Sequence, residues 1–235
     1  MNTEKLGELI IEYKQDFRIN WPTESYKWKA IKHFQDNWDI KADNFVMMLD
    51  KSLDMTGNLL ASIHNYPRSM ISQFAEADEE GTRAMFANLY DETKDITERV
   101  EQFQTSSERM RETYDTGTWR QHYQSLNAIS TYLWLRYPDK YYIYKYSEYK
   151  AMSEEINSSF TPRRGQAANN MIDGFEFYDE ICSILQSDTE MVRKLNSVIT
   201  DDCYPDPNLK TLTIDLGYYC YRYYPEKDNE RYDEW

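Results

Sequence analysis

The spacing of apolar residues is the feature that most constrains how this chain folds. Only seven Gly and seven Pro interrupt its 235 residues. Between them, apolar side chains recur with a period near 3.6 residues, which is typical of amphipathic helices. One stripe places Met171, Phe175, Tyr178, Cys182 and Leu185 at steps of four and three residues. The sequence therefore predicts a mainly α, multi-helix globular domain.

Residues that start or stop helices divide this pattern into segments. Short polar side chains can accept hydrogen bonds from the free N–H groups of a first turn, and proline disfavours helical geometry in the residue before it. We expect breaks at Pro22 and Pro138. The predicted caps are Asp43, Asp78, Asp95 and Ser187.

Two segments do not fit the helical period cleanly. Residues 141–146 alternate aromatic rings with Ile143 and Lys145, which predicts at most a short strand or hairpin near 141–146. Residues 212–224 suit a strand or a helix, and the helical surroundings favour a helix.

The loop 161–165, with a proline and two arginines, is the best candidate boundary in the chain. The expected organisation is a helical N-terminal domain, 1–160, that carries a basic aromatic segment, 118–150. A helical C-terminal subdomain, 166–224, and a charged tail, 225–235, follow it.

Charge and apolar content exclude several classes of protein. The net charge of -14 argues against a domain that coats the DNA backbone over its whole surface. No apolar run approaches the roughly 18 to 20 residues of a membrane span, and no signal peptide opens the chain, so we expect a cytoplasmic protein without a membrane partner. The spacings of Cys182, Cys203 and Cys220 match no metal or redox pair, which indicates ordinary buried thiols.

Catalytic motifs are also missing. No glycine precedes a lysine, so the segment has no phosphate-binding P-loop, and His33, His64 and His122 lack the spacing of metal ligands. Asp139, Glu148 and Lys150 formally match a metal-dependent nuclease motif, but 147–150 resembles the start of a helix rather than a strand. We expect no metal, no cofactor and no enzymatic activity in this segment, and a nuclease is the weaker alternative.

The basic aromatic segment 118–150 carries the most chemical information. It holds five Lys and Arg against two acidic residues, a local charge of +3, together with ten aromatic rings. Cations neutralise phosphates and rings stack on exposed bases, so this composition suits a nucleic-acid groove. The alternative is that the rings form core and the cations solvate its edge. The candidate DNA contacts are Trp119, Arg120, Arg136, Lys140, Tyr142, Tyr144 and Lys145, extended by Arg163 and Arg164 in the following loop.

Four longer strings carry a resemblance to a known family. They are 26–40 (YKWKAIKHFQDNWDI), 57–62 (GNLLAS), 121–150 (QHYQSLNAISTYLWLRYPDKYYIYKYSEYK) and 201–219 (DDCYPDPNLKTLTIDLGYY). Together they resemble the N-terminal region of McrB-type proteins, the AAA+ motor subunits of modification-dependent (type IV) restriction systems. In that family the N-terminal domain selects DNA, often through a modified cytosine. A GTP- or ATP-hydrolysing ring then drives a partner endonuclease. No site residue of the family transfers to this sequence.

The leading hypothesis is therefore a DNA-recognition or target-sensing domain of a McrB-like antiviral defence protein that lacks the motor. Its expected partners are DNA, in modified or unmodified form, the AAA+ motor module and the endonuclease subunit. An acidic protein-interaction module that senses a phage component, or docks the motor and nuclease subunits, is the alternative that the net charge favours.

Overall fold

Helices make up all the regular elements of the described chain, as predicted. The computed structural model describes residues 1–61 and 65–225. Its first half contains α1 (Thr3–Glu24), α2 (Tyr26–Asn37), α3 (Phe45–Ser52), the 3-10 helix η1 (Asp54–Leu59), α4 (Pro67–Ala77), α5 (Glu79–Leu89) and α6 (Ile96–Tyr114). The second half contains α7 (Leu126–Arg136), α8 (Tyr146–Glu155), α9 (Ala168–Ser187), α10 (Thr189–Asn196) and α11 (Lys210–Arg222).

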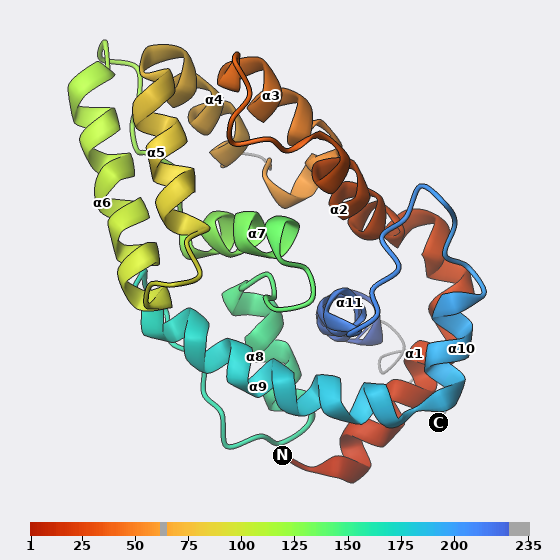
Figure 1. Ribbon diagram of the computed structural model, residues 1–235. Coiled ribbons are helices and arrows are strands. Elements are labelled where there is room, and N and C mark those ends of the chain that lie inside the picture. Colours follow the sequence, from red (N-terminus) through yellow and green to blue (C-terminus); the bar gives the residue numbers. More distant parts are fainter. Residues whose placement is uncertain (62–64, 226–235) are drawn as a thin grey trace.

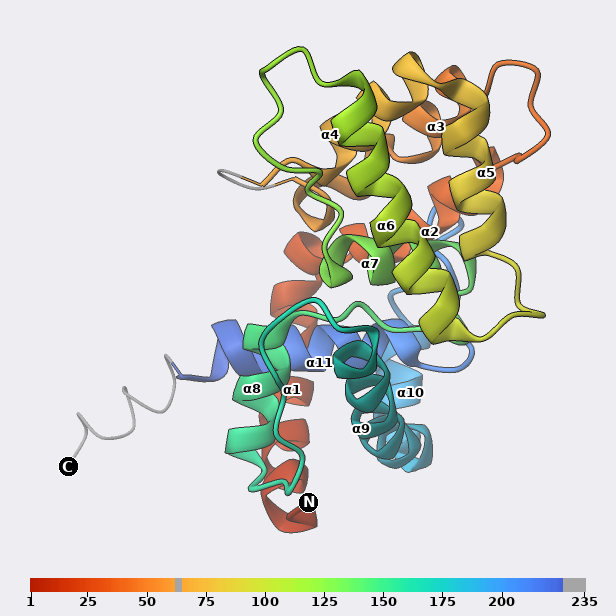
Figure 2. The same ribbon diagram turned by 90° about the vertical axis from the view of Figure 1, so that its left-hand side faces the viewer.

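Two helices, α7 and α11, lie at the centre of the molecule (Figure 1). Nine of the 11 residues of α7 and nine of the 13 residues of α11 are buried. A helix that is covered on all sides shows no single apolar stripe, and buried residues occur on every face of it. Figure 2 shows α3 to α6 gathered at one end, and α1, α8, α9 and α10 at the other.

The C-terminal helices complete the core that the N-terminal helices begin. Helix α11 packs against α8, α1 and α9, and α9 also contacts α6 and α7. Buried side chains from 1–160 and from 166–224 belong to one hydrophobic cluster. The predicted boundary 161–165 is thus a loop that joins α8 to α9 and does not separate two cores. Residues 226–235 of the predicted tail lie outside the described residues.

Three predicted helix ends need correction by one to three residues. Helix α1 continues through Pro22 to Glu24, because Trp21 packs against Phe17 and Trp28 and holds the last turn in place. Asn44 rather than Asp43 caps α3, and Asp188 rather than Ser187 caps α10. In both caps the residue next to the predicted one also has a short polar side chain. The caps at Asp78 and Asp95 are confirmed, as is the end of α7 before Pro138. The segment 212–224 is helical as predicted, with the helix spanning Lys210–Arg222.

The run 141–146 forms no strand. It leads from α7 into α8 without a partner strand among residues 1–61 and 65–225, and the backbone N–H of Tyr144 donates to the Ser130 hydroxyl on α7 at 2.8 Å. Its alternating rings therefore reflect a segment threaded between helices. The three cysteines are buried free thiols, as expected. Among the described helices, none combines the length and apolarity that crossing a membrane requires.

Candidate functional site

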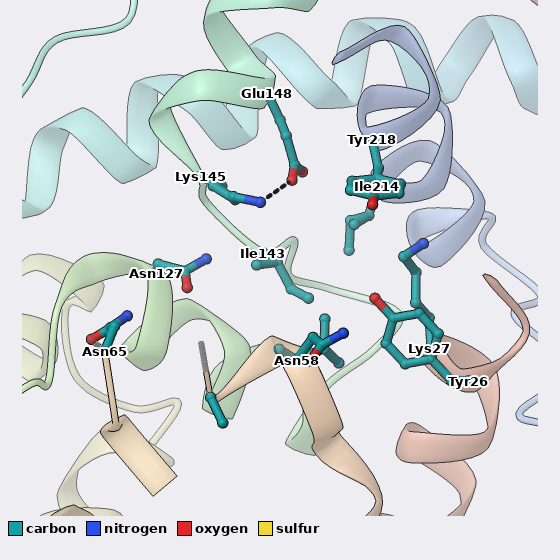
Figure 3. A pocket seen from close by; sticks show the side chains of 12 residues that line it. Tyr26, Lys27, Asn58, Asn65, Asn127, Ile143, Lys145, Glu148, Ile214 and Tyr218 are labelled. Atoms are coloured by element: carbon teal, nitrogen blue, oxygen red, sulfur yellow. Dashed lines mark hydrogen bonds and ion pairs between the residues drawn. The ribbon is translucent and has the colours of Figure 1, made fainter. Parts of the chain in front are cut away.

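A cavity of about 310 Å³ lies where α2, η1, α7, α8 and α11 meet (Figure 3). Twelve residues line it, and eleven of them fall within 26–40, 57–62, 121–150 and 201–219; Asn65 is the exception. Segments that are far apart in the sequence thus contribute to one space. The four strings that carry the family resemblance converge on this cavity.

The floor of the cavity is a buried charge network centred on Lys27. The Lys27 ammonium group donates to Glu24 at 2.5 Å and to Asp215 at 2.6 Å. Tyr13 donates to the second oxygen of Asp215, and Tyr223 to the second oxygen of Glu24, each at 2.6 Å. Burial alone would lower the pKa of Lys27, but the neighbouring Asp215, Tyr26 and Glu24 outweigh it and raise this pKa. Lys27 therefore stays charged.

One wall carries a second ion pair, between Lys145 and Glu148. The Lys145 ammonium group donates to Glu148 at 2.8 Å, and it lies 5.9 Å and 5.7 Å from the ring centres of Tyr218 and Tyr221. Glu148 is only 6% exposed, and its carboxylate projects towards the cavity in Figure 3. Burial raises the pKa of Glu148, while Lys145 and Lys27 act in the opposite direction. Only one of its carboxylate oxygens accepts a hydrogen bond from the described residues.

A shallower depression of about 220 Å³ adjoins the cavity and shares Asn127 and Lys145 with it. We call it the outer depression. It contains the cations Lys145 and Arg164, and no described Asp or Glu lines it. The Arg164 guanidinium group lies over the ring of Tyr146 at 4.6 Å. The N-terminus of α7, capped by Ser125, also opens here and adds partial positive charge.

The structure divides the predicted DNA contacts into separate places. Tyr144, Lys145 and Arg164 line the outer depression, and Arg163 is exposed nearby with Asp173 at 3.9 Å. Arg136 and Lys140 lie at the other end of α7, about 16 Å away along an 11-residue helix. There Lys140 is paired with Glu92.

Two further predicted contacts, Trp119 and Arg120, lie in the loop after α6. The half-buried indole ring of Trp119 packs on Phe74 and donates to Gln73 at 2.8 Å, while Arg120 beside it is exposed. The nine candidates therefore do not form one continuous groove.

Most rings of the segment 118–150 are core. Tyr132, Trp134, Tyr141, Tyr142, Tyr144 and Tyr149 are all buried. Tyr142 is fully enclosed, and its hydroxyl donates to Asp179 while accepting from Lys210. Neither Tyr142 nor the buried Tyr144 offers an open ring face for stacking on a base. Aromatic alternation here records packing between helices.

The residues of the formal nuclease motif have separate partners. Glu148 lies on helix α8 and is paired with Lys145, whereas Lys150 is paired with Glu154. Asp139 accepts a hydrogen bond from Tyr204 at 2.6 Å. Within the described part of the chain, no three His, Cys, Asp or Glu side chains are placed to share a metal ion.

The sequence did not reveal Tyr26, Lys27, Glu24 and Asp215 as site residues. One signal was present, because Asp215 interrupts the apolar run of Leu212, Ile214 and Leu216. A charged residue at such a position is buried and needs a partner of opposite charge. Its partner Lys27 lies 188 positions earlier, so only the folded chain identifies the pair.

Comparison with protein-family models, with curated proteins and with solved structures gives no match for this chain.

Proposed function

We propose that this chain is a DNA-recognition module of a McrB-like modification-dependent restriction protein, acting for a motor and an endonuclease subunit. One observation carries the proposal: the four strings that resemble the McrB-type N-terminal region converge on a single cavity. All four strings contribute side chains to its lining, which supports assigning this cavity and its rim as the recognition site.

The rim supplies contacts that a DNA backbone needs. Lys145 and Arg164 line the outer depression, and the N-terminus of α7 reinforces them. Lys145 is also paired with Glu148 on the side of the cavity, so Arg164 carries the larger share of the free positive charge. Exposed Arg163 extends this surface. A local basic surface resolves the objection raised by the net charge of -14, because an acidic protein can bind DNA where its cations gather.

Binding of unmodified and cytosine-modified duplexes at several salt concentrations tests the proposal. We expect Arg164→Glu to weaken binding to all duplexes. The slope of the logarithm of the binding constant against the logarithm of the salt concentration should fall by the amount that corresponds to about one phosphate contact. Arg136→Glu is the matched control, because Arg136 lies at the far end of α7. No binding at low salt, or equal effects of the two substitutions, would refute the proposal.

An acidic protein-interaction module remains the second candidate, supported by the net charge. In that case the intact chain should capture a protein partner from infected cells, and nuclease treatment should not release it. Recovery of nucleic acid alone would exclude this candidate.

A further inference from the structure

The cavity and the outer depression form one space with two different linings. Asn127 and Lys145 belong to both, so the two volumes of about 310 Å³ and 220 Å³ meet at these side chains. Together they fall within the range of roughly 300 to 1,000 Å³ typical of small-molecule sites. The inner part is lined by rings, amides, two lysines and a carboxylate, and the outer part by two cations and uncharged side chains.

The inner part is rich in hydrogen-bond donors. An ammonium group has three N–H donors. Glu24 and Asp215 take two from Lys27, which leaves one for the inner part among the described contacts. Glu148 takes one from Lys145, which leaves two at the border with the outer depression. The amide groups of Asn58 and Asn65 also line the cavity. Such a lining matches a ligand with several acceptor atoms.

The same space also offers partners for a planar ring and for the hydroxyl groups of a ligand. Tyr26 and Tyr218 line the cavity from α2 and α11, with the Lys27 ammonium group 5.1 Å and 4.7 Å from their ring centres. Half-buried rings of this kind stack on heterocycles. The second oxygen of Glu148 can accept from a sugar hydroxyl or an amino group.

We propose that the central cavity and the outer depression bind one free nucleoside monophosphate, with its base and sugar in the cavity and its phosphate between Lys145 and Arg164. The ligand's acceptor-rich base meets the spare donors, and its dianionic end meets the cations and the N-terminus of α7. The site shares its rim with the proposed DNA surface, but binding of a free nucleotide does not depend on that function.

Calorimetric titration of the whole chain tests this proposal. The probes are the deoxynucleoside 5′-monophosphates of the four common bases, the matching nucleosides and inorganic phosphate. At least one monophosphate should bind about tenfold more tightly than both its nucleoside and phosphate. Arg164→Gln should remove the advantage over the nucleoside.

Two further variants separate the halves of the site. Asn58 is exposed on the cavity wall, so Asn58→Trp should fill the cavity and weaken nucleoside and monophosphate alike without disturbing buried charges. Arg120→Gln, a change at an exposed arginine elsewhere, should leave every affinity unchanged. Thermal unfolding of each variant confirms that it is folded.

Three outcomes would overturn the proposal. A monophosphate that binds no better than inorganic phosphate would indicate an anion site only. Unchanged binding in Asn58→Trp would place the ligand elsewhere. DNA binding that depends on Arg164, without any binding of mononucleotides, would refute the free-nucleotide site and leave the DNA proposal standing. Binding of a mononucleotide without binding of DNA would instead support the free-nucleotide site and refute the DNA proposal.

Discussion

Lys27 is buried and has two carboxylate partners among the described residues. The network around it joins three helices. Glu24 ends α1, Lys27 lies in the first turn of α2, and Asp215 lies in α11. Burying an ammonium group costs free energy that only close, hydrogen-bonded carboxylates offset. The contacts at 2.5 Å and 2.6 Å provide this compensation. The network therefore fixes the floor of the cavity.

Replacing Lys27 by methionine should destabilise the protein strongly. The change leaves Glu24 and Asp215 buried without their cation, and losing one partner of a buried pair costs about 3–5 kcal/mol. Urea unfolding measures the loss. Adding Glu24→Gln and Asp215→Asn should restore most of the stability, and a triple variant as unstable as Lys27→Met would contradict this account.

Asp206 should make the stability of the protein depend on pH. Its buried carboxylate accepts hydrogen bonds from the backbone N–H groups of Thr211 and Leu212 and from the Trp28 indole N–H. Burial raises the pKa of Asp206 to about 7, although these donors act in the opposite direction. In the unfolded chain the pKa is about 3.9. The folded state thus holds the proton more tightly, and the stability from Asp206 is complete below about pH 4 and is lost as the pH rises to about 7.

Comparing unfolding of the wild type and Asp206→Asn from pH 3 to pH 8 isolates this effect. The difference in stability between the two should change mainly between about pH 4 and pH 7. Asp202→Asn is a control of opposite sign, because Lys29 and Thr200 lower the pKa of exposed Asp202 to about 2. Its difference from the wild type should change only below about pH 4, and a flat Asp206 difference would contradict the assignment.

At the scale of the helices, the crossing of α9 and α11 depends on a glycine. A Cβ atom at Gly217 would lie 2.0 Å from the Tyr178 hydroxyl oxygen. That hydroxyl is buried and has no hydrogen-bond partner in the part of the chain that the structure describes. The ring of Tyr178 also stacks on Tyr149 at 3.9 Å, which restricts its movement. The two helices approach this closely only because residue 217 has no side chain.

Gly217→Ala should therefore cost about 1–3 kcal/mol through overpacking, despite the better helix propensity of alanine. Gly7→Ala is the matched control: a Cβ at Gly7 meets nothing within 4 Å, so it should stabilise α1 slightly. Tyr178→Phe removes the clashing oxygen and should rescue much of the Gly217→Ala loss. Urea unfolding of the wild type, the three single variants and the double variant Gly217→Ala/Tyr178→Phe measures these effects. Additive effects of Gly217→Ala and Tyr178→Phe would exclude the clash.

At the scale of the whole molecule, the chain forms one core around α7 and α11. Helix α11 comes late in the sequence yet packs against α1 and α8, which come earlier. Trp28 and Trp134 in the N-terminal region are both fully buried, and the Trp134 indole N–H donates to Thr211 on α11 at 3.1 Å. Residues 1–160 alone would leave the centre of the molecule without α11.

We therefore expect the whole chain to unfold in one cooperative transition. Tryptophan fluorescence and far-ultraviolet circular dichroism should give coincident urea curves. A fragment of residues 1–160 should lack such a transition and expose apolar surface. Separate transitions in the whole chain, or a cooperatively folded fragment, would favour the division at 161–165.

The sequence by itself determined the helical class and many helix ends, because apolar period, caps and prolines act within a few residues of each other. The helices before Pro138 and after Asp78 and Asp95 follow from such local chemistry. The sequence could not predict two features: the conformation of residues 141–146 and the partners of the charged side chains. The ring alternation over 141–146 has the local signature of a strand, but no partner strand exists among the described residues, and helices surround the segment.

Only the tertiary structure decided where the charges meet. Lys27 and Asp215 are an ordinary lysine and aspartate until the fold removes both from water and places them 2.6 Å apart. The fold likewise separates Arg136 from Lys145, which the sequence grouped in one basic segment, by the length of α7. Electrostatic partners depend on distance in space and on burial, and neither can be read from positions along the chain.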